Sequence, residues 1–134
     1  MYDSFYLNGM FTIDTNIIIA YLGGEENVIS QIQEWKRHDR PLIISSITEC
    51  EVLSFPRLSP LEEERAEKFL KENFIAFPFD GIRARYSAAV RRKITRLKLP
   101  DAAIASLALE MGTPLITRNI RDFKNIPGLQ LINL

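Results

Sequence analysis

The stretch that decides the fold is residues 11–16, Phe11-Thr12-Ile13-Asp14-Thr15-Asn16. Residues 11–14 are a short apolar segment that ends in a carboxylate, which predicts a buried strand. The apolar residues 16–22 predict a helix directly after it. In open parallel sheets, ligand sites lie beyond the C-terminal ends of the strands. Asp14 therefore stands where such a fold places its functional side chains.

Outward from this stretch, strand-like and helix-like segments alternate. Short apolar runs predict further strands at residues 42–44, 75–79, 115–117 and 129–132. Apolar periodicity, capping patterns and proline positions predict helices at residues 25–38, 46–55, 60–73, 81–97 and 100–111. The alternation predicts an α/β fold, a three-layer α/β/α sandwich with a mainly parallel central sheet.

Two of the expected helices begin with the pattern of a capping box. Ser46 is followed by Glu49 three residues later, and Ser59 is followed in the same way by Glu62. Pro60 adds a second signal, because proline is favoured at the first helical position. We therefore expect Ser46 and Ser59 to cap their helices.

Length and composition indicate a globular protein with a single core rather than a membrane or zinc protein. The 134 residues suit one domain, with residues 1–9 as a flexible N-terminal extension because they lack a clear period. No apolar run is long enough to span a bilayer, so no membrane partner is expected. Cys50 is the only cysteine and His38 the only histidine, which argues against a zinc site and fits a reducing, cytoplasmic compartment.

Charge is unevenly distributed along a chain whose formal net charge is zero. Residues 82–98 contain basic residues and no acid, so this face could hold a polyanion such as RNA. The candidates for that contact are Arg91, Arg92, Lys93 and Arg96. A solvated helix face is an equally good interpretation of the same residues.

Glu51 and Asp101 interrupt otherwise apolar helical stripes. Glu51 is expected to share a helix face with Ile47, Cys50 and Ser54, and Asp101 a stripe that includes Ile104. Each acid also has a structural interpretation. Asp14 could cap the following helix, Asp101 could complement its helix dipole, and Glu51 could pair with an arginine.

Three carboxylates near the ends of apolar elements together indicate a cation pocket. Magnesium and manganese prefer oxygen ligands, and a cluster of acids without histidine or cysteine favours these ions. We therefore expect Mg²⁺ or Mn²⁺ as the cofactor, with Asp14, Glu51 and Asp101 as metal-binding and catalytic residues.

Four segments in series resemble the PIN-domain nucleases, in particular VapC-type toxins of toxin–antitoxin pairs. They are residues 11–16, 44–53, 99–105 and 115–123, and the similarity in order and spacing extends over nearly the whole chain from Met10. The resemblance implies a metal-dependent endoribonuclease, active as a homodimer and inhibited by a partner antitoxin. The apolar helices around residues 17–22 and 53–55 would form the antitoxin groove, or they are simply core.

The same resemblance assigns roles to polar residues around the three acids. Asn16 and Thr117 would organise the carboxylates through hydrogen bonds. Many family members carry a fourth acid where this chain has Asn119, and Asp122 follows shortly after. Asn119 could supply a carbonyl ligand or orient a metal-bound water, and Asp122 could supply the missing charge or be a loop acid. The number of metals, one or two, depends on this point.

Three other functions compete with the nuclease. A degenerate, non-catalytic PIN-like module could bind RNA or a protein, since Asn119 replaces an acid. A magnesium-dependent phosphatase would need a second aspartate two residues after Asp14, where Asn16 stands. A phosphotransfer receiver domain would need an acidic pair after the first strand, which Asp14 lacks.

Overall fold

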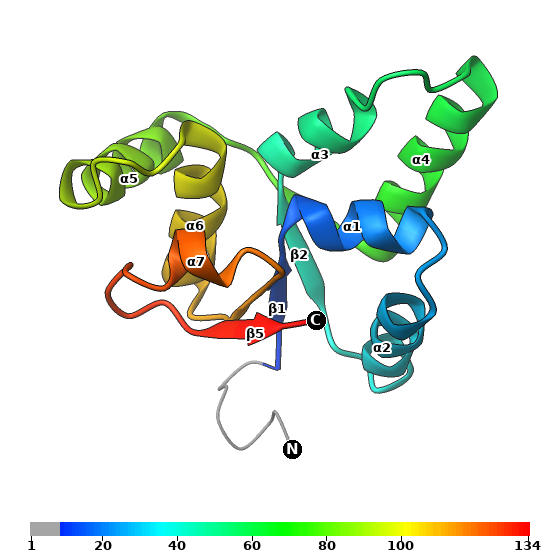
Figure 1. Cartoon of the computed structure of the whole chain (residues 1–134), viewed down its shortest axis with the longest axis horizontal. Coiled ribbons are helices and arrows are strands. Elements are labelled where there is room, and N and C mark those ends of the chain that lie inside the picture. Colours follow the sequence, from blue (N-terminus) through cyan, green and yellow to red (C-terminus); the bar gives the residue numbers. More distant parts are fainter. Residues whose placement is uncertain (1–8) are drawn as a thin grey trace.

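The computed structural model describes residues 9–134, and nearly all of the expected N-terminal extension, residues 1–8, lies outside this part. Five strands form one sheet in the order β3-β2-β1-β4-β5, and every neighbouring pair is parallel. The strands are β1 (Phe11–Ile13), β2 (Leu42–Ser45), β3 (Ile75–Phe77), β4 (Leu115–Thr117) and β5 (Leu131–Asn133). The predicted parallel α/β architecture is confirmed (Figure 1).

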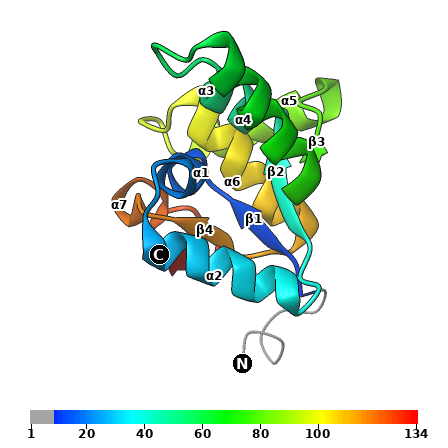
Figure 2. The same ribbon diagram turned by 90° about the vertical axis from the view of Figure 1, so that its right-hand side faces the viewer.

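Seven helices in the described part of the chain cover the two faces of the sheet (Figures 1 and 2). They are α1 (Thr15–Leu22), α2 (Glu26–Arg37), α3 (Ser46–Leu53), α4 (Pro60–Asn73), α5 (Gly81–Lys93), α6 (Leu99–Met111) and α7 (Ile120–Phe123). One buried cluster joins α1–α4 to Phe11, Ile13 and Ile116, and a second joins α5–α7 to Leu115. None of these helices is both long and apolar enough to cross a membrane.

The order of the strands reverses beside β1. The chain adds β2 and β3 on one side of β1 and then returns to place β4 on the other side. Ile13 pairs with Ile116, so the residues that follow them, Asp14 and Thr117, emerge together at the C-terminal edge of the sheet. Such a reversal of strand order is the position where open α/β sheets bind ligands.

The predicted capping box at Ser46 is wrong, whereas the one at Ser59 is confirmed. Ser59 and Glu62 exchange hydrogen bonds in the expected reciprocal way. At α3, the cap is Ser45, whose hydroxyl accepts from the backbone N–H of Ile47 at 3.1 Å. Ser45 is the last residue of β2 and has extended backbone angles, so Ser46 is already helical. The Ser46 hydroxyl instead accepts from the backbone N–H of Phe79.

The basic helix is shorter than predicted, because α5 ends at Lys93 rather than Leu97. Leu97 is only 4% exposed and belongs to the second buried cluster. Burying this side chain turns the chain inward, and the guanidinium of Arg91 donates to the Leu97 carbonyl at 3.1 Å. Arg96 therefore lies in the connection between α5 and α6 instead of on a helix.

The predicted helix faces are also corrected. The buried residues of α3 are Thr48 and Val52, whereas Cys50 and Ser54 are exposed, so Glu51 lies at the edge of the buried face. In α6, every residue from Ala102 to Ala108 is buried, and no single apolar stripe exists. Helices that are apolar all round lie inside the protein, and α6 packs between the sheet and α5. The short helix α7 has no counterpart in the prediction, and β5 begins two residues later than predicted.

Candidate acidic site at the edge of the sheet

Asp14 both caps α1 and forms the centre of the site. Its side chain is 4% exposed and accepts three hydrogen bonds. The backbone N–H of Thr15 donates to Oδ1 at 2.8 Å, while the Thr117 hydroxyl and the Asn16 amide donate to Oδ2 at 2.7 and 3.1 Å. The capping interpretation of Asp14 is therefore correct, and it is compatible with a role in the site because Oδ1 accepts only one of these bonds.

Thr117 fixes the Asp14 carboxylate from the neighbouring strand. Its hydroxyl is buried and accepts a hydrogen bond from the backbone N–H of Asn119 at 2.9 Å. Because this N–H occupies an acceptor position, the Thr117 proton is directed at Asp14. The side chain of Asn119 makes no capping bond to α7 and is exposed. Asn119 thus supports the site with its backbone.

Glu51 comes to the site from α3. The Thr15 hydroxyl donates to Oε1 of Glu51 at 2.6 Å, and the Thr48 hydroxyl lies 3.3 Å from the Thr15 hydroxyl. Thr15 therefore bonds to Asp14 through its backbone and to Glu51 through its side chain. No ion pair joins Glu51 to an arginine within residues 9–134, contrary to the structural alternative considered for this residue.

Asp101 lies in the first turn of α6, half-buried at the same edge. Burial raises the pKa of Asp101 to about 6, and repulsion from Asp14, Asp122 and Glu51 contributes to this, while Lys98 opposes it. Burial also raises the pKa of Asp14, with a smaller contribution from Glu51, against the hydrogen bonds from Thr117, Thr15 and Asn16. The acids affect one another's ionisation because they share one region of the fold.

The acids converge without forming a closed metal cage. Within residues 9–134, no three acidic, histidine or cysteine side chains are arranged to hold a metal ion directly. The four carboxylates nevertheless interact electrostatically across β1, α3, α6 and α7. Figure 1 shows the first turns of α1, α3 and α6 at the same end of the central strands.

The basic residues proposed as polyanion contacts are close in sequence to the helix that carries Asp101. Arg91, Arg92 and Lys93 are exposed in the last turn of α5, and residues 94–98 lead directly into the helix that carries Asp101. Arg96 is exposed within that connection. The four basic residues are therefore exposed, and three of them end the helix that precedes the one carrying Asp101.

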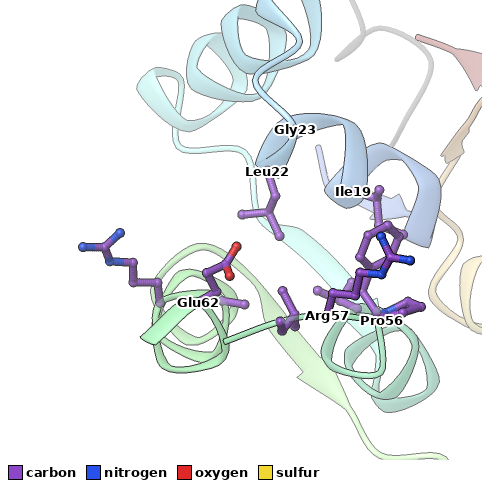
Figure 3. A pocket seen from close by; sticks show the side chains of 11 residues that line it. Ile19, Leu22, Gly23, Pro56, Arg57 and Glu62 are labelled. Atoms are coloured by element: carbon purple, nitrogen blue, oxygen red, sulfur yellow. The ribbon is translucent and has the colours of Figure 1, made fainter. Parts of the chain in front are cut away.

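A separate apolar groove lies between α1, α3 and α4 (Figure 3). It has a volume of about 450 Å³, and its apolar lining includes Ile19, Leu22, Val52, Phe55, Leu58 and Ala66. Arg57, Glu62 and Arg65 add charged groups to this lining. Residues 17–22 divide between the two interpretations, since Ile17 and Ile18 are buried core while Ile19 and Leu22 line the groove. Binding of an antitoxin in this groove stays a prediction.

Sequence reasoning missed Thr48 and gave Thr15 no role, although both connect the acids. Their positions contained a usable signal. Thr15 directly follows Asp14, and Thr48 precedes Glu51 by three residues, so the two hydroxyls lie beside the carboxylates on their own helices. It also missed the ion pair between Arg118 and Glu25, which no local pattern predicts because 93 residues separate the two.

Fold and site together define a parallel α/β protein with a cluster of acidic side chains where the strand order reverses. The chain belongs to the PIN domain family, whose model matches residues 11–129. It is 27% identical to a protein named Ribonuclease VapC from Rickettsia bellii, over 91% of this chain and 94% of that protein.

Two solved structures have a fold similar to that of this chain. A chain of a toxin–antitoxin complex from Klebsiella pneumoniae is 33% identical, with a TM-score of 0.74 over 90% of this chain and 94% of that one. A chain of VapBC2 from Rickettsia felis, solved bound to a promoter DNA fragment, has a TM-score of 0.78 over 93% and 98%, at 22% identity. The second likeness supports the fold, and the first also supports the family.

Proposed function

We propose that this chain is a metal-dependent endoribonuclease and the toxin of a toxin–antitoxin pair. The observation that carries the proposal is the convergence of Asp14, Glu51 and Asp101 at the reversal of strand order. The relatives named as VapC ribonucleases and the toxin–antitoxin complex from Klebsiella pneumoniae support it. A cytoplasmic location follows from the same proposal.

The donor set of the site fits a hard divalent cation, and we take Mg²⁺ or Mn²⁺ as the cofactor. All candidate donors are oxygens. Burial, with a smaller contribution from the neighbouring acids, raises the pKa values of Asp14 and Asp101, and a bound cation would favour their ionised forms. Asp14 would hold the ion together with Glu51 and Asp101, partly through water, since magnesium keeps several of its waters. When bound, such an ion supplies an activated water and neutralises charge on a phosphoryl group.

Asp122 is the better candidate for the fourth acid. Its charge contributes to the raised pKa of Asp101, so its carboxylate lies near that of Asp101, whereas Asn119 contributes a backbone N–H to Thr117. The remaining chemistry belongs to the protein's own groups. Without metal, the pKa of Asp101 is about 6, so its carboxylate is mostly ionised at neutral pH and available to hold the ion. Arg91, Arg92, Lys93 and Arg96 would hold the RNA backbone through salt-sensitive contacts.

The apolar groove is the proposed seat of the antitoxin. Leu22 and Phe55 line it and are 45% and 50% exposed, which is unusual for side chains of this size unless a partner covers them. We expect a small open reading frame beside the gene to encode this partner. By resemblance to the family we also propose a homodimer, which light scattering of the purified chain would test.

The decisive experiment compares Asp14→Asn and Asp101→Asn with the native chain in cleavage of a mixed RNA substrate with Mg²⁺. Each substitution removes a carboxylate charge without much change in size, and we expect cleavage to fall about a thousandfold, on the order of several kcal/mol. Two variants are needed because Asp14 is a buried cap, whereas Asp101 is half-buried. Calorimetry with Mn²⁺ should show binding to the native chain and weaker binding to both variants.

Glu49→Gln is the matched control, because Glu49 lies on α3 two residues before Glu51 and is not among the charges that shift the pKa values of Asp14 and Asp101. It should leave cleavage unchanged, and circular dichroism should confirm that all variants are folded. Unchanged cleavage by folded Asp14→Asn and Asp101→Asn would overturn the assignment. RNA binding without metal binding or cleavage by the native chain would instead favour a non-catalytic module.

A further inference from the structure

Arg118 makes contacts at both ends of α1. It directly follows Thr117, and its backbone N–H donates to Oδ1 of Asn16, in the first turn of α1, at 3.4 Å. Its guanidinium forms an ion pair with Glu25, which lies after the end of α1. An eight-residue helix is about 12 Å long, so one arginine connects the two ends of α1 to the strand that carries Thr117.

Asn16 links this contact to the Asp14 carboxylate. Its amide nitrogen donates to Oδ2 of Asp14 at 3.1 Å, while its amide oxygen accepts from Arg118. A carboxylate can only accept and a backbone N–H can only donate, so these two partners allow one orientation of the amide. A displacement of the Arg118 backbone would therefore remove the partner that fixes the Asn16 amide against Asp14.

The position of this ion pair matters more than its strength. The two side chains are 34% and 45% exposed, and exposed pairs contribute little to global stability. The pairs Arg37–Glu34, Lys68–Glu72 and Arg83–Asp80 lie within three or four residues of each other. Arg118–Glu25, by contrast, joins the connection after β4 to the turn at Gly23 and Gly24, where Gly24 has a positive φ of 86°.

We propose that Arg118 and Glu25 are positioning residues for the acidic site. The pair holds residues 117–119 against α1, and so keeps the Thr117 hydroxyl and the Asn16 amide aimed at Asp14. Neither residue needs to touch the substrate. The effect on cleavage rests on the proposed ribonuclease function, whereas the effect on the Asn16 amide does not.

The test uses Glu25→Gln, Arg118→Gln, the double variant, and the charge exchange Glu25→Arg with Arg118→Glu. Each single variant should lower kcat roughly tenfold with KM unchanged, as is typical for residues that orient metal ligands. The double variant should be no worse than either single one, because both break the same contact. The charge exchange should restore most of the lost activity.

A second readout uses the metal-free protein. The side-chain amide of Asn16, observed by ¹H–¹⁵N NMR, should change its chemical shifts in both single variants and return toward the native position in the charge exchange. Glu34→Gln is the matched control, because it removes an exposed pair with Arg37 inside α2 and should leave kcat and the Asn16 amide unchanged. If the native chain fails to cleave RNA, the amide still decides the proposal while the proposed function falls.

Two results would overturn the positioning role. In the first, Arg118→Gln raises KM and weakens the salt dependence while Glu25→Gln has no effect, which would make Arg118 a direct RNA contact. In the second, the Asn16 amide is unchanged in both single variants. Either result would show that breaking the ion pair does not change the position of the groups that hydrogen-bond to Asp14.

Discussion

The acidic site and the apolar groove occupy opposite ends of the same helix. Asp14 and Thr15 stand at the start of α1, and Ile19 and Leu22 line the groove toward its end. In the site, donors and acceptors inside the protein satisfy the polar groups and fix them. In the groove, large apolar side chains remain exposed, such as Phe55 at 50%.

In the acidic site, hydrogen bonds within the protein already hold the side chains in position. In the groove, the apolar side chains are still exposed and could be covered by a partner. The acidic site is assembled from β1, α3, β4 and α6, so its geometry depends on the whole fold. The groove is formed by α1, α3, α4 and the loop between α3 and α4, and its apolar surface gains free energy only when something covers it. Substitutions at the two places should therefore have separable effects on catalysis and on association.

Among the further substitutions that test this separation, the largest effect is expected from Phe55→Ala in the groove. Removing this side chain takes away about 2 kcal/mol of apolar contact with the antitoxin, so Kd should rise ten- to a hundredfold. RNA cleavage by the variant should stay at the native level. Titration of the protein encoded beside this gene, followed by calorimetry, measures the affinity.

Leu61→Ala is the control for Phe55→Ala. Leu61 is 53% exposed on α4, similar to Phe55, but it does not line the groove. Its substitution should leave the antitoxin affinity unchanged. Equal losses in both variants, or a loss of cleavage in Phe55→Ala, would break the separation between groove and site.

An effect of intermediate size is expected on the free energy of unfolding of the metal-free protein when the pH is changed or Asp101 is replaced by Asn. The pKa of Asp101 rises from 3.8 to about 6 on folding, so the folded state binds a proton more tightly than the unfolded state between these values. The free energy of unfolding should therefore decrease as pH rises from about 4 to 6, and Asp101→Asn should remove this dependence. The variant should be about 1–2 kcal/mol more stable than the native chain at pH 7.5, after allowance for solvent screening.

Urea unfolding at pH 5 and pH 7.5 measures this difference. The gain from Asp101→Asn should be smaller at pH 5, where the native carboxyl is mostly protonated. A stability gain that is the same at both pH values would show that the charge of the partly buried Asp101 carboxylate is not its cause.

The smallest effect is expected from the basic end of α5. Arg92→Gln combined with Lys93→Gln should raise KM for RNA a few-fold at low salt and leave kcat unchanged, because phosphate contacts are electrostatic and screened by salt. The dependence of KM on salt should become less steep. Lys68→Gln on α4 is the control, and an equal change there would indicate a general effect of net charge.

Local signals predicted local structure well. Ser59, Pro60 and Glu62 predicted the start of α4, and Gly112 predicted the end of α6, because these residues interact with the helix termini beside them. Errors arose where distant parts of the chain compete. Ser46 is bonded to Phe79, and Leu97 is drawn into the core, so neither position follows its local pattern.

The sequence by itself determined the class of fold, the three principal acids and their approximate places at the ends of elements. Hydrophobic periodicity depends on residues that are close in sequence, and a carboxylate that follows an apolar segment can be recognised from the sequence alone. Only the tertiary structure decided which groups contact those acids. Thr15 donates a hydrogen bond to Glu51, Thr117 donates one to Asp14, and Arg118 forms an ion pair with Glu25 nearby. These contacts join residues 36, 103 and 93 positions apart, and only the packing of strands and helices brings such residues within hydrogen-bond distance.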